Sequence, residues 1–402
     1  MSCSREPPAV LIAAVSGRAL AAAARRAGYV PLVADLFNDL DTREIAAASI
    51  RVSGSLARGL DQQSLLDTLD RLADGRRQVG VVYGSGFEDR PALLAAIAHR
   101  HKLIGNPPEI IAQVKDPFAF AELCRRANIP HPETQRTRGA RGQWLQKGIG
   151  AAGGTHVHPA GKRRSAPTSV IPLPTPLTAA PIPIMAGLVP AISRRPRVYF
   201  QRHAAGRAIS ALFLADGKRA LVLGFSEQWT APAPKRPFRY GGAARPAAVP
   251  AAQAEQMARA VARLVFASGL VGLCSADFLL RPDGFDLLEI NPRPGATLDI
   301  FRDAEGRLFH LHLDACRGRL PRTAPTFPGA AAASVVYAPS RIRVPPGFAW
   351  PDWTADRQPS DEDVPPGAPL CTVIAEAQSA CLARRLAGDR ATELLAMTGA
   401  PA

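Results

Sequence analysis

Apolar runs alternate with amphipathic stretches over the first hundred residues, and the two patterns predict strands and helices. The apolar runs cover residues 9–15, 29–34 and 79–83, and the helical stretches cover residues 18–27 and 61–73. Gly28 ends the first helical pattern, and Asp61 stands at the N-cap position of the second. Strands that alternate with helices predict a parallel sheet with right-handed crossovers. We therefore expect an α/β domain over residues 1–105.

From residue 106 onward the pattern changes to helices and β-hairpins. Helices are expected at residues 110–114, 117–127 and 253–268, with strands starting at Trp144 and Arg197. Hairpins are expected at residues 209–214 with 220–225 and at residues 273–280 with 285–290. We assign residues 106–330 to this second domain. Residues 331–402 form a small β-rich C-terminal unit, with strands at 334–337 and 370–375 and a helix near 377–387.

A proline-rich tract interrupts the second domain. Residues 165–193 contain no charged residue and seven prolines. Each proline inside a helix costs about 3 kcal/mol, so this tract does not predict a membrane-spanning helix. Because it also lacks the pattern of a packed layer, we interpret residues 160–196 as a surface insertion.

The charge of the chain is strongly positive but uneven. The 402 residues are 47% hydrophobic and 21% charged, which excludes disorder over the whole length, and the net charge is +15. Residues 134–215 hold twelve Lys and Arg and no acidic residue; subtracting twelve from +15 leaves +3 for the rest. A basic nucleic-acid-binding protein is therefore an alternative. Only four aromatic residues lie in that segment, fewer than base stacking favours, so we expect no nucleic acid and no membrane as partner.

The cysteines and the N-terminus predict the compartment. Six cysteines are scattered along the chain without a C-x-x-C pair, which favours reduced thiols over a disulfide framework or a zinc site. The N-terminus has no basic region followed by an apolar stretch of signal-peptide type. We expect a cytoplasmic location.

A glycine-rich turn is the first candidate for chemistry. Residues 148–153 satisfy G-x-G-x-x-G, the dinucleotide fingerprint, but they lie in the middle of the chain and do not open a helix. We therefore reject that reading. Small residues still let backbone N–H groups point at a phosphate, and Lys147 precedes the turn. A flexible hairpin turn without a ligand is the alternative.

A stronger signal lies in the last predicted hairpin. Asp277 stands in one strand, and Glu289 and Asn291 follow at alternate positions of its partner, so all three face one side of the sheet. Hard oxygen ligands of this kind suit Mg²⁺ or Mn²⁺. Arg293 follows, with a side chain suited to a phosphoryl oxygen. The alternative is a surface aspartate and an ordinary N-P-R-P turn.

These residues resemble the ATP-grasp superfamily. The resemblance rests on Asp277, the Glu-x-Asn-x-Arg run that starts at Glu289, and Lys147 ahead of the glycine-rich turn; it covers roughly residues 9–310. It implies an ATP-grasp fold preceded by a Rossmann-like α/β domain. Residues 199–210 and 288–301 are most similar to the branch that ligates a carboxylate to an amine. That branch includes the tyramine–glutamate ligase of methanofuran synthesis and the pyrrolysine-pathway ligase.

The resemblance also implies roles for individual residues. The ATP phosphates would meet Lys115, Lys147 and the loop glycines Gly148, Gly150, Gly153 and Gly154. The adenine hinge would contain Gln201, Arg202 and His203, where Gln201 departs from the glutamate usual in the family. Magnesium would be held by Asp277, Glu289 and Asn291, and the catalytic cations would be Arg293 and Lys147.

The expected activity is an ADP-forming ligase that joins a small-molecule carboxylate to an amine through an acyl phosphate, with ATP and Mg²⁺. The pathway is expected to be cofactor biosynthesis. An ATP-grasp carboxylase or phosphotransferase is the alternative within the fold. The altered hinge and the insertion also leave open a protein that binds ATP without turnover. The sequence leaves a homo-oligomer open.

Overall fold

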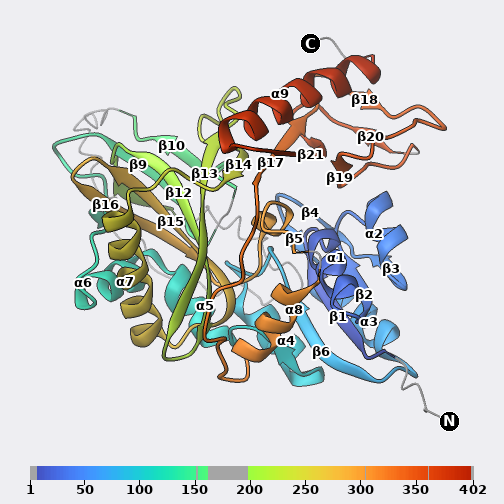
Figure 1. Cartoon of the computed structure of the whole chain (residues 1–402), viewed down its shortest axis with the longest axis horizontal. Coiled ribbons are helices and arrows are strands. Elements are labelled where there is room, and N and C mark those ends of the chain that lie inside the picture. Colours follow the sequence, from blue (N-terminus) through green and yellow to red (C-terminus); the bar gives the residue numbers. More distant parts are fainter. Residues whose placement is uncertain (1–6, 151–152, 162–197, 304, 361, 400–402) are drawn as a thin grey trace, which may run out of the picture.

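The structure is a computed structural model that describes residues 7–150, 153–161, 198–303, 305–360 and 362–399. Most of the predicted insertion, from residue 162 onward, lies outside the described residues. The described chain forms an N-terminal α/β domain, a small antiparallel sheet and one large antiparallel sheet (Figure 1).

The N-terminal domain is built on a parallel sheet of five strands in the order β3-β2-β1-β6-β7. Its strands are β1 (Ala9–Ala14), β2 (Val30–Asp35), β3 (Ala48–Arg51), β6 (Gln78–Tyr83) and β7 (Leu103–Ile104). Its helices are α1 (Arg18–Arg26), α2 (Leu40–Ile45), α3 (Gln62–Ala73) and α4 (Pro91–Arg100). Every residue of β1 is buried because the sheet is covered on both faces. The predicted α/β fold class is confirmed.

Two short helices lead from this domain into the second sheet. Helix α5 (Pro108–Lys115) is followed at once by α6 (Pro117–Arg126), and Asp116 caps α6 by accepting hydrogen bonds from two backbone N–H groups. The small sheet has the order β10-β9-β11-β8. Its strands are β8 (Thr134–Gln135), β9 (Trp144–Gly148), β10 (Val157–Pro159) and β11 (Val198–Arg202). The glycine-rich turn joins β9 to β10.

The large sheet has eight antiparallel strands in the order β16-β15-β12-β13-β14-β17-β21-β19. Its first five strands in this order are β16 (Gly284–Asn291), β15 (Val271–Arg281), β12 (Arg207–Asp216), β13 (Ala220–Thr230) and β14 (Tyr240–Arg245). Helix α7 (Ala251–Ser268) buries Met257, Val261 and Leu264 in one core cluster with Phe213 and Phe278 of the sheet. Strand β13 runs to Thr230 and is therefore longer than the predicted strand at residues 220–225.

The C-terminal segment extends the same large sheet. Its strands there are β17 (Ala330–Tyr337), β21 (Pro369–Ala377) and β19 (Thr354–Ala355); β18 (Ile342–Arg343) and β20 (Asp363–Val364) pair separately. Helix α9 (Ala380–Met397) packs on β17 and β21 at the top of Figure 1 and is longer than the predicted helix. The predicted C-terminal unit thus shares a sheet with the strands that carry Asp277 and Glu289.

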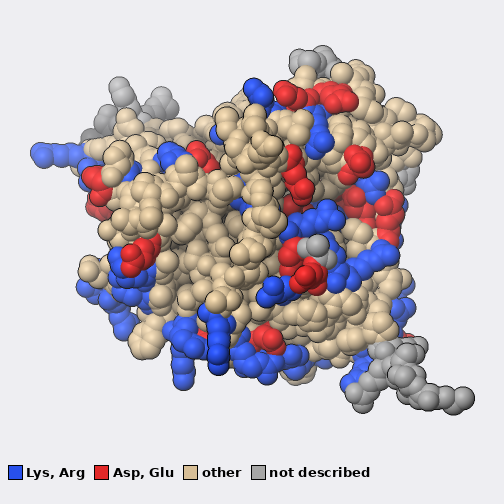
Figure 2. Space-filling view, viewed as in Figure 1, with Lys and Arg blue, Asp and Glu red and all other residues tan. Residues whose placement is uncertain are grey.

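The N-terminal domain packs against the large sheet next to the carboxyl end of β16. Helix α1, the 3-10 turn η1 (Ala296–Asp299) and helix α8 (Arg307–Ala315) contribute to one buried apolar cluster with strands β1 and β12. Arg18 bridges this junction, donating to Asp299 and Asp356. None of the helices that the structure describes is apolar over a length sufficient to cross a membrane. Acidic and basic side chains are interspersed over much of the face shown in Figure 2.

Candidate active site

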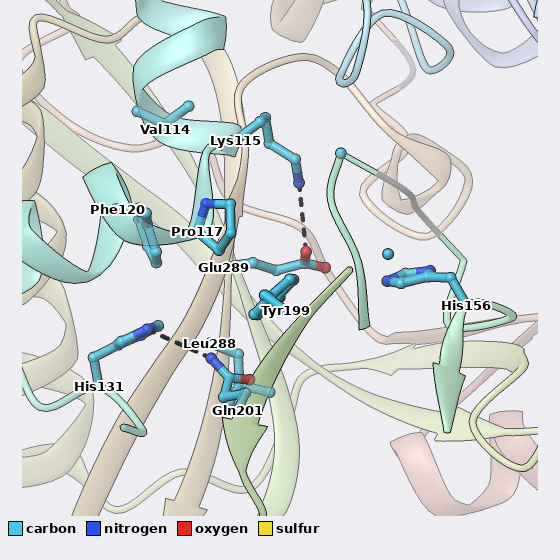
Figure 3. A pocket seen from close by; sticks show the side chains of 12 residues that line it. Val114, Lys115, Pro117, Phe120, His131, His156, Tyr199, Gln201, Leu288 and Glu289 are labelled. Atoms are coloured by element: carbon cyan, nitrogen blue, oxygen red, sulfur yellow. Dashed lines mark hydrogen bonds and ion pairs between the residues drawn. The ribbon is translucent and has the colours of Figure 1, made fainter. Parts of the chain in front are cut away.

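A pocket opens between the small sheet and β16, where α5 ends. It is lined by residues of α5, α6, β11 and β16 together with Gly148, Gly150 and His156 from the glycine-rich turn. Figure 3 shows Lys115, Glu289, Tyr199 and His156 converging on the same space. Four separate stretches of sequence therefore meet here.

Lys115 and Glu289 form the charged centre of the pocket. Lys115 is the last residue of α5, its side chain is 6% exposed, and its Nζ donates to the Ile290 carbonyl at 3.2 Å. The same Nζ lies 3.4 Å from Glu289 Oε2 (Figure 3). Burial alone would raise the pKa of Glu289, but the positive charges of Lys115 and Lys147 outweigh it, so the pKa is lowered. The Glu289 carboxylate is therefore ionised at neutral pH.

Lys147 of β9 is held by Gln201, a residue of β11 that lines the pocket. Its Nζ donates to Gln201 Oε1 at 2.6 Å, while Gln201 Nε2 donates to Thr134 Oγ1 at 3.4 Å. Gln201 is 2% exposed, and burial lowers the pKa of Lys147. Because the amide carries no charge, it orients Lys147 without neutralising it. A glutamate at this position would pair with the charge of Lys147, whereas Gln201 gives it no acidic partner in this contact.

The three expected magnesium ligands lie on adjacent strands. Asp277 faces Glu289 across the β15–β16 pairing, and Asn291 Nδ2 donates to Asp277 Oδ2 at 3.0 Å. Ser210 Oγ and Gln228 Nε2 also donate to Asp277, at 2.6 and 3.3 Å. Burial, together with the charge of Glu289, raises the pKa of Asp277 to about 6. Two repelling carboxylates and an amide oxygen form a donor set that fits a divalent cation.

The protein supplies few side chains to bind a metal ion at this site. Among the residues that the structure describes, no three His, Cys, Asp or Glu side chains gather in a way that would hold a metal ion. A cation at Asp277 and Glu289 would therefore depend on ligand oxygens and water for the rest of its coordination, as Mg²⁺ commonly does.

The glycine-rich turn is packed between the N-terminal domain and the large sheet. Gly150, Gly153 and Gly154 have φ angles of 73°, 72° and 71°, which side chains rarely adopt. A side chain at Gly150 would collide with Asp89, and one at Gly154 would collide with the Phe238 carbonyl. Tyr240 N also donates to the Gly153 carbonyl at 3.0 Å. The described part of the turn is thus placed directly over the pocket.

The remaining predicted residues divide into two groups. Arg293 follows β16, and its Nε donates to Glu88 Oε1 of the N-terminal domain at 2.8 Å. Arg202 and His203 are exposed, and Arg202 Nη1 lies 3.5 Å from Glu133 Oε2, so their side chains do not line the pocket. Any contact that they make with a nucleotide would therefore use the backbone.

Three residues of the site were missed or read differently from the sequence. His131 lines the pocket and bonds to the Leu287 carbonyl through Nδ1 at 2.7 Å. His156 precedes β10, lines the pocket and turns its ring toward Glu289 (Figure 3). Glu88 carries no local sequence signal, because its partner Arg293 is 205 residues away.

Solved structures with the same overall fold cover nearly the whole chain. N5-carboxyaminoimidazole ribonucleotide synthetase from Thermotoga maritima has a TM-score of 0.64 and 14% identity, covering 96% of this chain and 98% of its own. L-amino acid ligase from Bacillus licheniformis has a TM-score of 0.66 and 11% identity, with 96% and 97% covered. Biotin carboxylase from Campylobacter jejuni, in a beta-gamma-ATP complex, has a TM-score of 0.65 and 13% identity, with 94% and 89% covered. At these identities the likeness concerns the fold alone.

The class of protein follows from the fold and from one family match. No curated protein sequence matches this chain. The family model described as ATP-grasp domain matches residues 187–297, which include β12 to β16 and the residues Asp277, Glu289, Asn291 and Arg293. The chain therefore contains an ATP-grasp domain, and the predicted superfamily is confirmed.

Proposed function

We propose that this protein is an ATP-dependent ligase that joins a carboxylate to an amine through an acyl phosphate. The observation that carries the proposal is the pocket beneath the glycine-rich turn, where Lys115 meets Glu289 and where Gln201, the partner of Lys147, also lies. Two lysines near a pair of carboxylates that face each other across two strands are suited to a nucleotide triphosphate and its divalent cation. The carboxylate–amine specificity rests on the resemblance of residues 199–210 and 288–301.

The proposed reaction requires positive charges close to the carboxylate and the γ-phosphate. A carboxylate is a poor acyl donor, so ATP converts it to an acyl phosphate, with the carboxylate oxygen forming a bond to the γ-phosphorus while ADP leaves. Both reactants are anions, and Lys115, Lys147 and Arg293 reduce their repulsion. Asp277, Glu289 and Asn291 would hold Mg²⁺, which neutralises charge on the phosphates. The amine then attacks the acyl carbon, forming the amide and releasing phosphate.

Water must be excluded while the acyl phosphate exists. Gly148 and Gly150 line the pocket, and the turn that contains them is packed against both Asp89 and the start of β14. A cover of this kind protects a reactive intermediate from hydrolysis. No nucleophilic side chain is required, because the γ-phosphate of ATP activates the acid.

Turnover with candidate acids and amines tests the proposal. We expect ADP release that depends on both substrates, with an amide among the products, and Glu289→Ala should lower its rate at least ~10²-fold. Asp283→Ala is the matched control, because Asp283 lies on the same hairpin with its side chain 83% exposed. Equal rates in the two variants would contradict the assigned site.

Product analysis separates the alternatives within the fold. A carboxylated product or a stable phosphorylated product in place of an amide would identify a carboxylase or a phosphotransferase. Binding of MgATP without ADP release, across a broad panel of acids and amines, would instead identify a nucleotide-binding protein without turnover.

A further inference from the structure

We propose that Glu88 of the N-terminal domain is a positioning residue for Arg293, so that the ATP-grasp domain depends on its neighbour for a correctly placed catalytic arginine. This inference rests on the proposed function, because it assigns Arg293 to the transferred phosphoryl group. It adds a residue from a part of the chain that the ATP-grasp match does not include.

The Glu88 carboxylate is fixed by bonds that do not involve Arg293. It follows β6 in the loop that leads to α4, and its side chain is 5% exposed. Its Oε2 accepts hydrogen bonds from the backbone N–H groups of Gly86 and Phe87, at 2.8 and 3.0 Å. Burial would raise the pKa of Glu88, but Arg293 and Lys115 lower it to about 2. A fixed carboxylate with a full charge therefore faces Arg293.

The contact uses one end of the guanidinium and leaves the other end open. Arg293 Nε donates to Glu88 Oε1 at 2.8 Å, and Nη1 has only a long contact of 3.4 Å to the adjacent Pro294 carbonyl. The Arg293 side chain is 12% exposed. An arginine that is bonded at Nε keeps its planar group in one orientation, and Nη2 makes no hydrogen bond to the residues that the structure describes.

The backbone beside Arg293 is held from the same part of the chain. Asn106, 1% exposed, donates through Nδ2 to the carbonyls of Pro292 and Val271, at 2.8 and 2.9 Å. The Val271 N–H donates back to Asn106 Oδ1 at 2.8 Å. Residues 88 and 106 thus fix the side chain and the main chain of one short segment. A displacement of about 1 Å at such a group costs ~10²-fold in rate.

A double-mutant cycle tests the role of Glu88. The variants are Glu88→Gln, Arg293→Ala and their combination, with Glu109→Gln as the matched control because Glu109 is exposed on α5. We expect Glu88→Gln to lower kcat for ADP release ~10- to 100-fold while the Kd for MgATP changes less than about threefold. In the Arg293→Ala background the same substitution should change kcat less than about twofold, because its effect passes through Arg293.

The outcomes distinguish this inference from the proposed function. Without a known substrate pair, the same cycle is measured as affinity for MgADP with aluminium fluoride, which mimics the phosphoryl group in transfer. If the wild-type protein binds no nucleotide, the proposed function fails and this inference fails with it. If the wild type binds and Glu88→Gln is unchanged, only the inference fails. The inference is also overturned if Glu88→Gln lowers kcat or affinity as much in the Arg293→Ala background as in the wild type. That result would show that Glu88 has a general structural role. Should Glu88→Gln not fold, Glu88→Asp replaces it in the cycle.

Discussion

Two buried arginines connect the N-terminal domain to the rest of the chain, and they are used in opposite ways. Arg18 donates from Nη1 and Nη2 to Asp299 at 2.5 and 2.6 Å, and from Nε and Nη2 to Asp356 at 3.0 and 3.2 Å. Arg293 donates strongly only from Nε, to Glu88. Arg18 thus makes four hydrogen bonds to protein carboxylates, whereas Arg293 makes one.

This difference separates a structural arginine from a functional one. Because four of its five N–H groups are taken by these two carboxylates, Arg18 contributes to stability rather than to ligand binding. An arginine that is bonded mainly through one nitrogen keeps hydrogen-bond donors for a ligand. This arrangement fits a group that binds an anion. The hydrogen bonds of Ser16 and Arg18 to Asp299 and Asp356 favour a structural turn at residues 16–18.

The largest effect is expected on stability, from Arg18→Ala. The substitution leaves Asp299 and Asp356 facing each other without a cation, and removing one partner of a buried ion pair costs about 3–5 kcal/mol. Urea unfolding measures this loss. Arg25→Ala on the exposed side of the same helix should change the free energy of unfolding by less than about 0.5 kcal/mol. Similar losses in both variants would refute the structural role of Arg18.

Arg293→Ala, in contrast, should reduce the rate of the reaction more than the stability of the fold. We expect kcat for ADP release to fall ~10²- to 10³-fold, because a cation aimed at the transferred phosphoryl is lost. The loss of stability should be smaller than for Arg18→Ala, because Glu88 keeps two backbone N–H donors. Steady-state kinetics and urea unfolding of the same preparation check both statements. A stability loss as large as that of Arg18→Ala, with little loss of rate, would contradict the proposed role of Arg293 in the reaction.

Two aspartates near Arg18 should respond to pH with the opposite sign to Glu88, whereas Asp356, bonded to Arg18 itself, has a pKa lowered by the Arg18 charge despite its burial, as Glu88 has by Arg293. Near Arg18, burial raises the pKa of Asp35 to about 6; burial and the charge of Asp356 raise the pKa of Asp39 to about 7. The folded chain therefore binds more protons than the unfolded chain between about pH 4 and 7, and these groups lower stability as pH rises through that window. Each group contributes up to about 1.4 kcal/mol per pH unit. Glu88, whose pKa is lowered to about 2, instead stabilises above about pH 4.5 and loses this contribution below it.

Asp39→Asn makes the pH effect measurable. Asparagine keeps the N-cap of α2, where Asp39 Oδ1 accepts from Thr42 N, but it removes the titrating group. The melting temperature of the wild-type protein should fall between pH 5.5 and 8, and that of Asp39→Asn should fall less. Identical slopes for the two proteins would show that Asp39 does not titrate in this range.

The smallest effect is expected for an exposed arginine at the hinge. Arg202 has a side chain that is 57% exposed and a single ion pair to Glu133. Exposed pairs contribute about 0–1 kcal/mol, so Arg202→Ala should leave the free energy of unfolding nearly unchanged. The Kd of Arg202→Ala for MgATP, measured by calorimetry, should stay within about twofold of the wild-type value. A larger loss of affinity would place the Arg202 side chain on the nucleotide.

Local patterns predicted the elements and part of the site. The apolar run before Asp283 and the one after it predicted the β15–β16 hairpin, and strand alternation placed Asp277 and Glu289 on one face; the pairing of these two residues agrees with this. The glycine-rich turn was correctly separated from a dinucleotide fingerprint because no helix follows it. These inferences needed only neighbours in sequence or one hairpin.

Features that depend on distant residues were not predictable. Glu88 reads as one charged residue in a loop, and nothing near it indicates Arg293. Strand β14 begins Tyr240-Gly241-Gly242, which lacks the alternation of a strand; it forms one because β13 and β17 pair with it on both sides. His156 faces the pocket because the turn folds over it, which periodicity does not encode.

The bridge made by Arg18 has a consequence for the order in which the chain can fold. Its partners are 281 and 338 residues further along the sequence, and Asp356 lies next to β19 at the far edge of the large sheet. On a ribosome, the strands of the N-terminal sheet emerge and pair first, whereas Arg18 cannot form its full set of bonds until residue 356 has been made. The junction therefore closes late in synthesis, and a truncated chain that ends before residue 356 exposes this surface to other chains in the cell.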